Sequence, residues 1–130
     1  MIVLDASAAI EWLLQSPVGV RIDKRIFSPS QSLHAPHLLD VEVAQVLRRY
    51  AREKTISEQR GEEALEDLGD LPLNRYPHDL LLRRVWELRA ALTAYDAVYV
   101  ALAELLDAPL LTCDKKIAFA SGHYATVELA

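Results

Sequence analysis

The chain has 130 residues and a formal net charge of −5, and its residues are 52% hydrophobic and 25% charged. This hydrophobic content excludes a disordered chain, and the length predicts one domain over residues 1–130. The single cysteine, Cys113, excludes an intramolecular disulfide and suits a reducing cytoplasm, where we expect the protein. No apolar run approaches the roughly 18–20 residues that span a bilayer, and no basic segment typical of a signal peptide is present, so no membrane role is predicted.

Strands and helices are predicted to alternate in the first half of the chain. A short apolar run that ends in a carboxylate indicates a buried strand, and apolar residues at helical spacing indicate amphipathic helices. In chain order we predict a strand over 1–5, a helix over 6–15, a mixed stretch with one short helix over 18–31, a strand over 33–35 and a helix over 37–54. Ser16 and Pro17 are interpreted as the end of the helix over 6–15.

The second half continues the same alternation. Ser57 is a favourable N-cap, and Thr93 with Asp96 has the form of a capping box. The predicted elements are a helix from Ser57 to about residue 68, a strand over 73–76, helices over 78–90 and 93–106, a strand over 110–113, a short helix over 114–120 and a strand over 126–128. This order is typical of an α/β fold in which helices cover a parallel sheet and ligands bind at the carboxyl ends of the strands.

Four acidic residues stand where this rule places a ligand site. Asp5 ends the first predicted strand, and Asp114 follows Thr112 within two residues. Asp96 lies in the first turn of its helix, and Glu42 lies in the second turn of the helix over 37–54. These acids span most of the sequence, but the topology lets them meet in one pocket.

Each of these acids also has a structural interpretation. Asp5, Asp96 and Asp114 are suitable helix caps, and most Glu residues on helices are solvated. Asp40 and Glu42 lie on opposite margins of the apolar stripe of their helix, so periodicity does not choose between them.

A convergence of four carboxylates would require a cation. At an effective dielectric of 20, two carboxylates about 5 Å apart repel by roughly 3 kcal/mol, and a domain is stable by only about 5–15 kcal/mol. Either the acids do not converge or a cation lies among them. Oxygen ligands without a His or Cys cluster favour Mg²⁺ or Mn²⁺, and such an ion can activate water for attack on a phosphodiester.

Four segments, residues 2–8, 36–49, 95–103 and 110–116, carry a resemblance to a known family. In their order and spacing the chain resembles the PIN-domain ribonucleases, in particular the VapC toxins of toxin–antitoxin pairs. The resemblance implies a PIN-like three-layer α/β/α sandwich with a central, mainly parallel sheet of about five strands. It also implies Mg²⁺- or Mn²⁺-dependent cleavage of RNA, with catalytic and metal-binding acids at Asp5, Glu42, Asp96 and Asp114.

The same resemblance favours Glu42 over Asp40 and suggests supporting residues and partners. Ser7 and Thr112 are expected to hold the acids by hydrogen bonds. Lys115 and Lys116 are the better candidates for RNA contacts, ahead of the arginines at 48, 49 and 52. A homodimer and a cognate VapB-like antitoxin are expected from the family.

Four alternatives remain open. A receiver-type phosphoacceptor domain would need an Asp after a third strand near the middle of the chain, which the sequence lacks. A phosphatase of the haloacid-dehalogenase type would need a second Asp at the position of Ser7. A PIN-fold RNA-processing nuclease that is not a toxin, and a non-catalytic binding module on the same fold, are compatible with the sequence.

Overall fold

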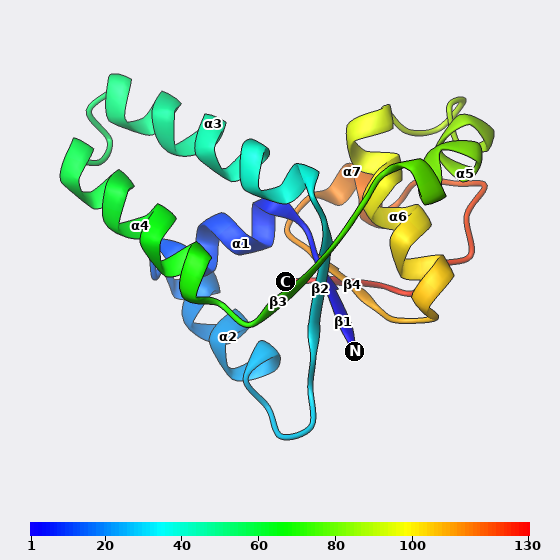
Figure 1. Cartoon of the computed structure of the whole chain (residues 1–130), viewed down its shortest axis with the longest axis horizontal. Helices are drawn as coiled ribbons and strands as arrows, with labels where there is room; N and C mark the ends of the chain where they lie inside the picture. The colour runs from blue at the N-terminus through cyan, green and yellow to red at the C-terminus, as the bar shows by residue number, and fades with distance from the viewer.

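Five short strands form one sheet in a computed structural model that describes residues 1–130 (Figure 1). They are β1 (Ile2–Leu4), β2 (Leu33–Pro36), β3 (Leu73–Tyr76), β4 (Leu110–Thr112) and β5 (Val127–Leu129). Their order is β3-β2-β1-β4-β5, and every pair is parallel. The central strand β1 pairs with β2 on one side and β4 on the other, and its three residues are fully buried. Such burial on both faces explains why this strand is a continuous apolar run.

Helices cover both faces of the sheet. On one side lie α1 (Ala6–Leu13), α2 (Pro17–Ile26), α3 (Leu38–Arg52) and α4 (Glu58–Asp70). On the other side lie η1 (Asp79–Leu81), α5 (Leu82–Glu87) and α6 (Ala94–Leu106), while α7 (Lys115–Ala118) packs against β4 and β5. The three-layer α/β/α fold predicted from the sequence is confirmed. None of these helices combines the length and the apolar character that crossing a membrane requires.

Ser16 and Pro17 follow the end of α1, as predicted, but they have a second role. Ser16 and Pro17 begin α2 rather than simply ending α1, because the Ser16 hydroxyl accepts a hydrogen bond from the Gly19 amide at 2.9 Å and Pro17 occupies the first turn. Gly19 lets α2 approach α1 closely, since a Cβ there would lie 1.9 Å from the backbone oxygen of Glu11. The mixed stretch predicted over 18–31 therefore does contain one short helix: α2 has ten residues, ends at Ile26 and is followed by a loop.

The helix predicted over 78–90 is shorter and divided in the structure. Its first turn is η1, and α5 ends at Glu87, where the backbone N–H of Leu88 turns back to carbonyls of the preceding turn. The strand predicted over 110–113 ends at Thr112, because the amide of Cys113 donates to a serine hydroxyl instead of a neighbouring strand. The second difference arises from a contact between residues far apart in the sequence, which the local pattern does not encode.

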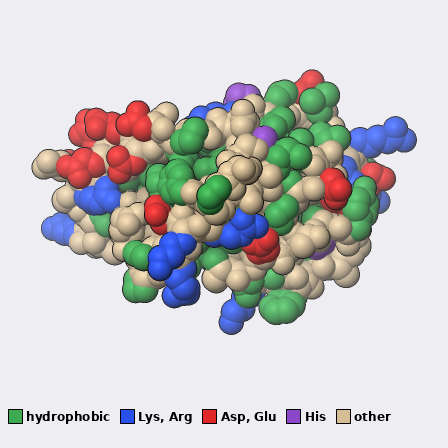
Figure 2. All heavy atoms as spheres, turned by 90° about the horizontal axis from the view of Figure 1, so that it is seen from below, with side chains coloured by type: hydrophobic (Ala, Val, Ile, Leu, Met, Phe, Trp, Pro, Cys, Tyr) green, Lys and Arg blue, Asp and Glu red, His purple; other side chains and the backbone are tan.

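Much of the acidic charge lies on one end of the molecule. Figure 2 shows acidic side chains gathered over the end that α3 and α4 form. On α4 the exposed acids are Glu58, Glu62, Glu63, Glu66, Asp67 and Asp70. The net charge of −5 is therefore largely a property of this solvated helix rather than of the carboxyl edge of the sheet.

Candidate active site

Asp5 leaves the sheet at its centre and begins helix α1. Its Oδ1 accepts hydrogen bonds from the Ala8 amide at 3.0 Å and from the Ser7 hydroxyl at 2.7 Å. Its Oδ2 accepts a hydrogen bond from the Thr112 hydroxyl at 2.5 Å. Only 3% of Asp5 is exposed, so three donors hold both carboxylate oxygens in a buried position. Asp5 is thus a helix cap, as one interpretation of the sequence expected. It is also a buried acid at the carboxyl end of the central strand.

Two hydroxyls connect the central strands to the last acidic segment. Besides binding Asp5, the Ser7 hydroxyl accepts from the Cys113 amide at 2.9 Å and lies 3.2 Å from the Thr112 hydroxyl. The Thr112 hydroxyl accepts from the Asp114 amide at 2.9 Å. These bonds place Asp114 beside Asp5, because β4 and β1 are adjacent parallel strands that end at the same edge.

Asp114 itself caps the short helix α7. Its Oδ1 accepts a hydrogen bond from the Lys116 amide at 2.8 Å. Lys115 and Lys116 are both exposed, and the positive charge of Lys116 offsets a part of the rise that burial causes in the pKa of Asp96. A cationic side chain therefore lies near the acids without forming an ion pair with any of them.

Glu42 and Asp96 come from two helices on opposite faces of the sheet. Glu42 lies on α3, and its Oε1 accepts a hydrogen bond from the Tyr99 hydroxyl of α6 at 2.5 Å. Asp96 lies one turn before Tyr99 on α6, where the Thr93 hydroxyl caps the helix by accepting from the Asp96 amide at 3.2 Å. Tyr99 therefore joins the two helices at the carboxyl edge.

The four acids influence one another electrostatically. Burial raises the pKa of Asp5, and the negative charge of Asp114 raises it further, while its hydrogen bonds act in the opposite direction. Burial likewise raises the pKa of Glu42 and of Asp96; charges on Asp96 and Asp5 add to the first shift, and the charge on Asp114 adds to the second. Burial and the Glu42 carboxylate raise the pKa of the Tyr99 phenol. Each acid is thus coupled to at least one other acid of the set.

The structure therefore brings all four sequence-predicted acids to one edge of the sheet. As placed, no three acidic, histidine or cysteine side chains lie close enough together to hold a metal ion. The donors are nevertheless oxygens only, partly buried and without an arginine or lysine partner, which is the chemistry that Mg²⁺ and Mn²⁺ prefer. The residues fit such an ion by donor type and charge.

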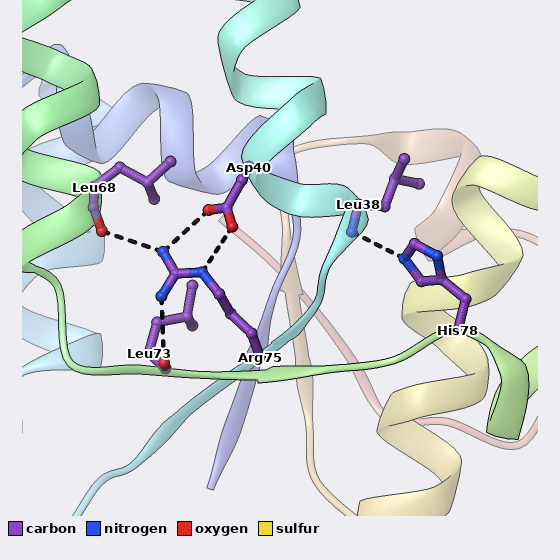
Figure 3. A network of polar contacts seen from close by, with 6 residues as sticks. All are labelled: Leu38, Asp40, Leu68, Leu73, Arg75 and His78. Atoms are coloured by element: carbon purple, nitrogen blue, oxygen red, sulfur yellow. Dashed lines mark hydrogen bonds and ion pairs between the residues drawn. The ribbon is translucent and has the colours of Figure 1, made fainter.

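Asp40 has a different environment, although it lies only two residues from Glu42. Figure 3 shows the Arg75 guanidinium bound to both oxygens of Asp40, at 2.7 and 3.0 Å. The same guanidinium reaches the backbone oxygens of Leu68 and Leu73 at 3.5 Å. Asp40 is thus neutralised in a structural ion pair with Arg75. Helical periodicity did not distinguish Asp40 from Glu42, but this ion pair does.

Sequence reasoning did not identify Tyr99 as a residue of the site. Only 2% of Tyr99 is exposed, so its ring does pack in the core, but its hydroxyl binds Glu42. Its spacing of three residues from Asp96 was a usable signal, because residues three apart share a helix face.

Cys113 is consistent with a packing role, since burial raises the pKa of its thiol to about 11.

Comparisons with known proteins agree with this arrangement. The PIN domain description matches residues 2–121. Ribonuclease VapC12 of Mycobacterium tuberculosis is 40% identical over 129 residues, covering 99% of this chain and 98% of the relative. Ribonuclease VapC1 of the same species is 42% identical over 128 residues, covering 98% and 96%. The structure of VapBC2 from Rickettsia felis, bound to a promoter DNA fragment, aligns with a TM-score of 0.71 over 99% of this chain and 98% of that one; at 12% identity it shows the fold.

Proposed function

This chain belongs to the PIN-domain family and, within it, to the VapC ribonucleases, and from that premise we propose a metal-dependent endoribonuclease that acts as the toxin of a type II toxin–antitoxin pair. The observation that carries the proposal is the set of four coupled carboxylates at the carboxyl edge, none of which has a basic ion-pair partner. A ribonuclease needs a bound cation at such a place, because its substrate is itself an anion.

The residues that would hold Mg²⁺ or Mn²⁺ are Asp5, Glu42, Asp96 and Asp114. When bound, such an ion lowers the pKa of a water molecule and stabilises the charge of a phosphoryl transition state. The chain supplies the positioning. Ser7 and Thr112 hold the oxygens of Asp5, while Tyr99 fixes the direction of Glu42.

Lys115 and Lys116 are the proposed phosphate contacts. Both are exposed and both follow Asp114 directly. The charge of Lys116 interacts with the Asp96 carboxylate. An ammonium near the acids would offset the repulsion between the RNA backbone and the acidic edge. The arginines on α3 (Arg48, Arg49 and Arg52) lie toward the end of that helix, six or more residues after Glu42.

The proposed protein partners are an antitoxin similar to VapB and a second copy of the chain. Support for the antitoxin comes from the structural neighbours, which include VapBC2 of Rickettsia felis and a toxin–antitoxin complex from Klebsiella pneumoniae. An antitoxin that placed a basic side chain at the acidic edge would supply the missing positive charge.

The receiver alternative is not supported, because β3 ends at Tyr76 and is followed by Pro77 and His78 rather than by an Asp.

The decisive experiment is RNA 5′-end sequencing after brief induction in cells of the wild type, Asp96→Asn and Asp40→Asn. We expect new 5′ ends with the wild type and with Asp40→Asn, and their loss with Asp96→Asn. Asp40→Asn is a matched control, because it removes an acid that already has an arginine partner.

Two outcomes would contradict the proposal. One is an unchanged set of new ends in Asp96→Asn. The other is the absence of cleavage both in cells and with purified protein supplied with Mn²⁺ and total RNA.

A further inference from the structure

A small cavity of about 170 Å³ lies between the start of α3, helix α5 and the start of α6. Hydrophobic side chains line it almost entirely, with one histidine among them, and the lining includes Leu38, His78, Leu82, Val85, Tyr95 and Val98. None of these residues is one of the four acids. The cavity is therefore a separate feature whose use the proposed cleavage chemistry does not explain.

The cavity adjoins the acidic edge through two helices. Leu38 lies four residues before Glu42 on α3, and residues four apart share a face of a helix. Tyr95 immediately precedes Asp96 on α6. A molecule whose phosphate lay at the acids could thus place an attached group in the cavity.

The single polar wall residue offers a hydrogen-bond donor. The Nε2 of His78 accepts a hydrogen bond from the Leu38 amide at 2.9 Å (Figure 3), so the neutral ring carries its proton on Nδ1. No protein group accepts from this Nδ1. The only buried side-chain polar atom without a partner is the Nε2 of His123, so the Nδ1 of His78 remains open to solvent.

The rim of the cavity is unusually apolar for a solvated surface. Tyr95 is 64% exposed and Leu82 is 58% exposed. An aromatic ring at this position provides a flat stacking surface beside the acids, and Lys116 adds a positive charge near Asp96. Flat apolar walls, one donor and a nearby cation match an unpaired nucleobase and its phosphate.

We propose that this cavity binds one unpaired nucleobase next to the scissile phosphate and thereby determines base preference at the cut. The base stacks on Tyr95 and presents an acceptor atom to the Nδ1–H of His78. Recognition of this kind requires single-stranded or looped RNA, because bases in a duplex are not free to enter a cavity. The inference rests on the proposed ribonuclease function. It adds that the protein recognises one unpaired base of its RNA substrate.

The first test is cleavage of a randomised single-stranded RNA pool by purified protein with Mn²⁺, with sequencing of the new ends. Loss of a stacking contact is expected to lower cleavage by Tyr95→Ala about ten-fold or more and to flatten the base preference at one position beside the cut. Tyr95→Phe keeps the ring and should keep both properties. Trp86→Ala removes an equally exposed aromatic residue of α5 outside the cavity and should also leave both unchanged.

The second test measures contact independently of activity. Asp114→Asn keeps a helix-capping side chain but should leave RNA uncut, so 4-thiouridine-containing RNA can be crosslinked to it by light and the attached residues identified by mass spectrometry. We expect crosslinks to Tyr95 or Leu82. Crosslinks in the cavity from a protein whose wild type cuts no RNA would support the base site while contradicting the proposed cleavage.

The converse results would overturn the inference alone. They are an unchanged base preference in Tyr95→Ala, or crosslinks that avoid the cavity, while the wild type still cuts RNA. Light scattering adds one more outcome: if Tyr95→Ala changes the oligomeric state and leaves the base preference intact, a second copy of the chain covers the cavity and no base enters it.

Discussion

Two groups of carboxylates in this molecule have opposite environments. In the first group, three acids that join structural elements each bind an arginine through two hydrogen bonds: Arg25 with Glu128, Arg75 with Asp40, and Arg84 with Glu104. The Glu104 side chain is only 3% exposed and is fully paired. These three acids are therefore neutralised by a planar, bidentate partner.

Acids at the carboxyl edge of the sheet receive no such partner. Asp5 is also buried, but its donors are two hydroxyls and an amide, and burial raises its pKa. Perturbed acids of this kind mark functional sites, because a fold gains nothing by leaving charges unbalanced. The contrast between paired and unpaired acids identifies the site more clearly than the overall charge does.

The largest expected effect separates Glu42 from Asp40 on the same helix. Glu42→Gln should lower RNA cleavage about a hundred-fold or more, because a lost metal ligand removes several kcal/mol of transition-state stabilisation. Asp40→Asn should retain cleavage and lower the free energy of unfolding by about 1 kcal/mol or less, since its pair with Arg75 is partly exposed. Cleavage rates and urea unfolding of both variants are the measurements. An equal loss of cleavage in the two variants would contradict the assignment of Glu42, and not Asp40, to the site.

Addition of Mn²⁺ should stabilise the protein only when the unpaired acids are intact. At a free Mn²⁺ concentration a hundred times its Kd, the free energy of unfolding of the wild type should rise by about 2.7 kcal/mol. In Asp5→Asn and Asp96→Asn this increase should shrink or vanish, whereas Asp40→Asn should behave as the wild type does. Calorimetric unfolding with and without Mn²⁺ is the measurement, and an equal increase in all four proteins would place the ion elsewhere.

Tyr99 tests whether the unpaired acids depend on their hydrogen-bond donors. Tyr99→Phe removes the hydroxyl that binds Glu42 and should weaken Mn²⁺ binding about ten-fold, as loss of an outer hydrogen bond to a metal ligand does. Tyr124→Phe is the control, because Tyr124 is 77% exposed and binds no acid through its hydroxyl. Unchanged Mn²⁺ affinity in Tyr99→Phe, measured by titration calorimetry, would show that Tyr99 serves packing alone.

The smallest expected effect is on the pH dependence of metal-free stability. The pKa of Asp5 is raised in the folded protein above its ordinary value of 3.8, so the folded state binds this proton more tightly than the unfolded state does. Stability from this group is therefore present at low pH and is lost as pH rises from about 3.8 through the raised pKa.

Asp5→Asn should accordingly show a weaker fall in stability over that pH window than the wild type. Urea unfolding at a series of pH values without metal is the measurement. A steeper fall in Asp5→Asn than in the wild type would reverse the sign and refute the assignment of a raised pKa to Asp5.

Local sequence signals predicted most of the architecture. The apolar run of β1, the cap at Ser57 and the capping box at Thr93 each act within a few residues, so each could be predicted without the rest of the chain. The signal at Ser16 and Pro17 was interpreted only as the end of α1, although the same two residues also begin α2. The close approach of Gly19 to Glu11 packs these two helices together, and a local signal does not contain that contact.

The sequence by itself predicted a parallel α/β protein and offered acids that its topology could bring to one edge of the sheet. The tertiary structure decided which acids stay unpaired, because the partners lie far away in sequence. Arg75 neutralises Asp40 across 35 residues, and Tyr99 reaches Glu42 across 57. Helical periodicity describes which face a side chain occupies, but the charge state and orientation of that side chain depend on the group that the fold brings opposite to it.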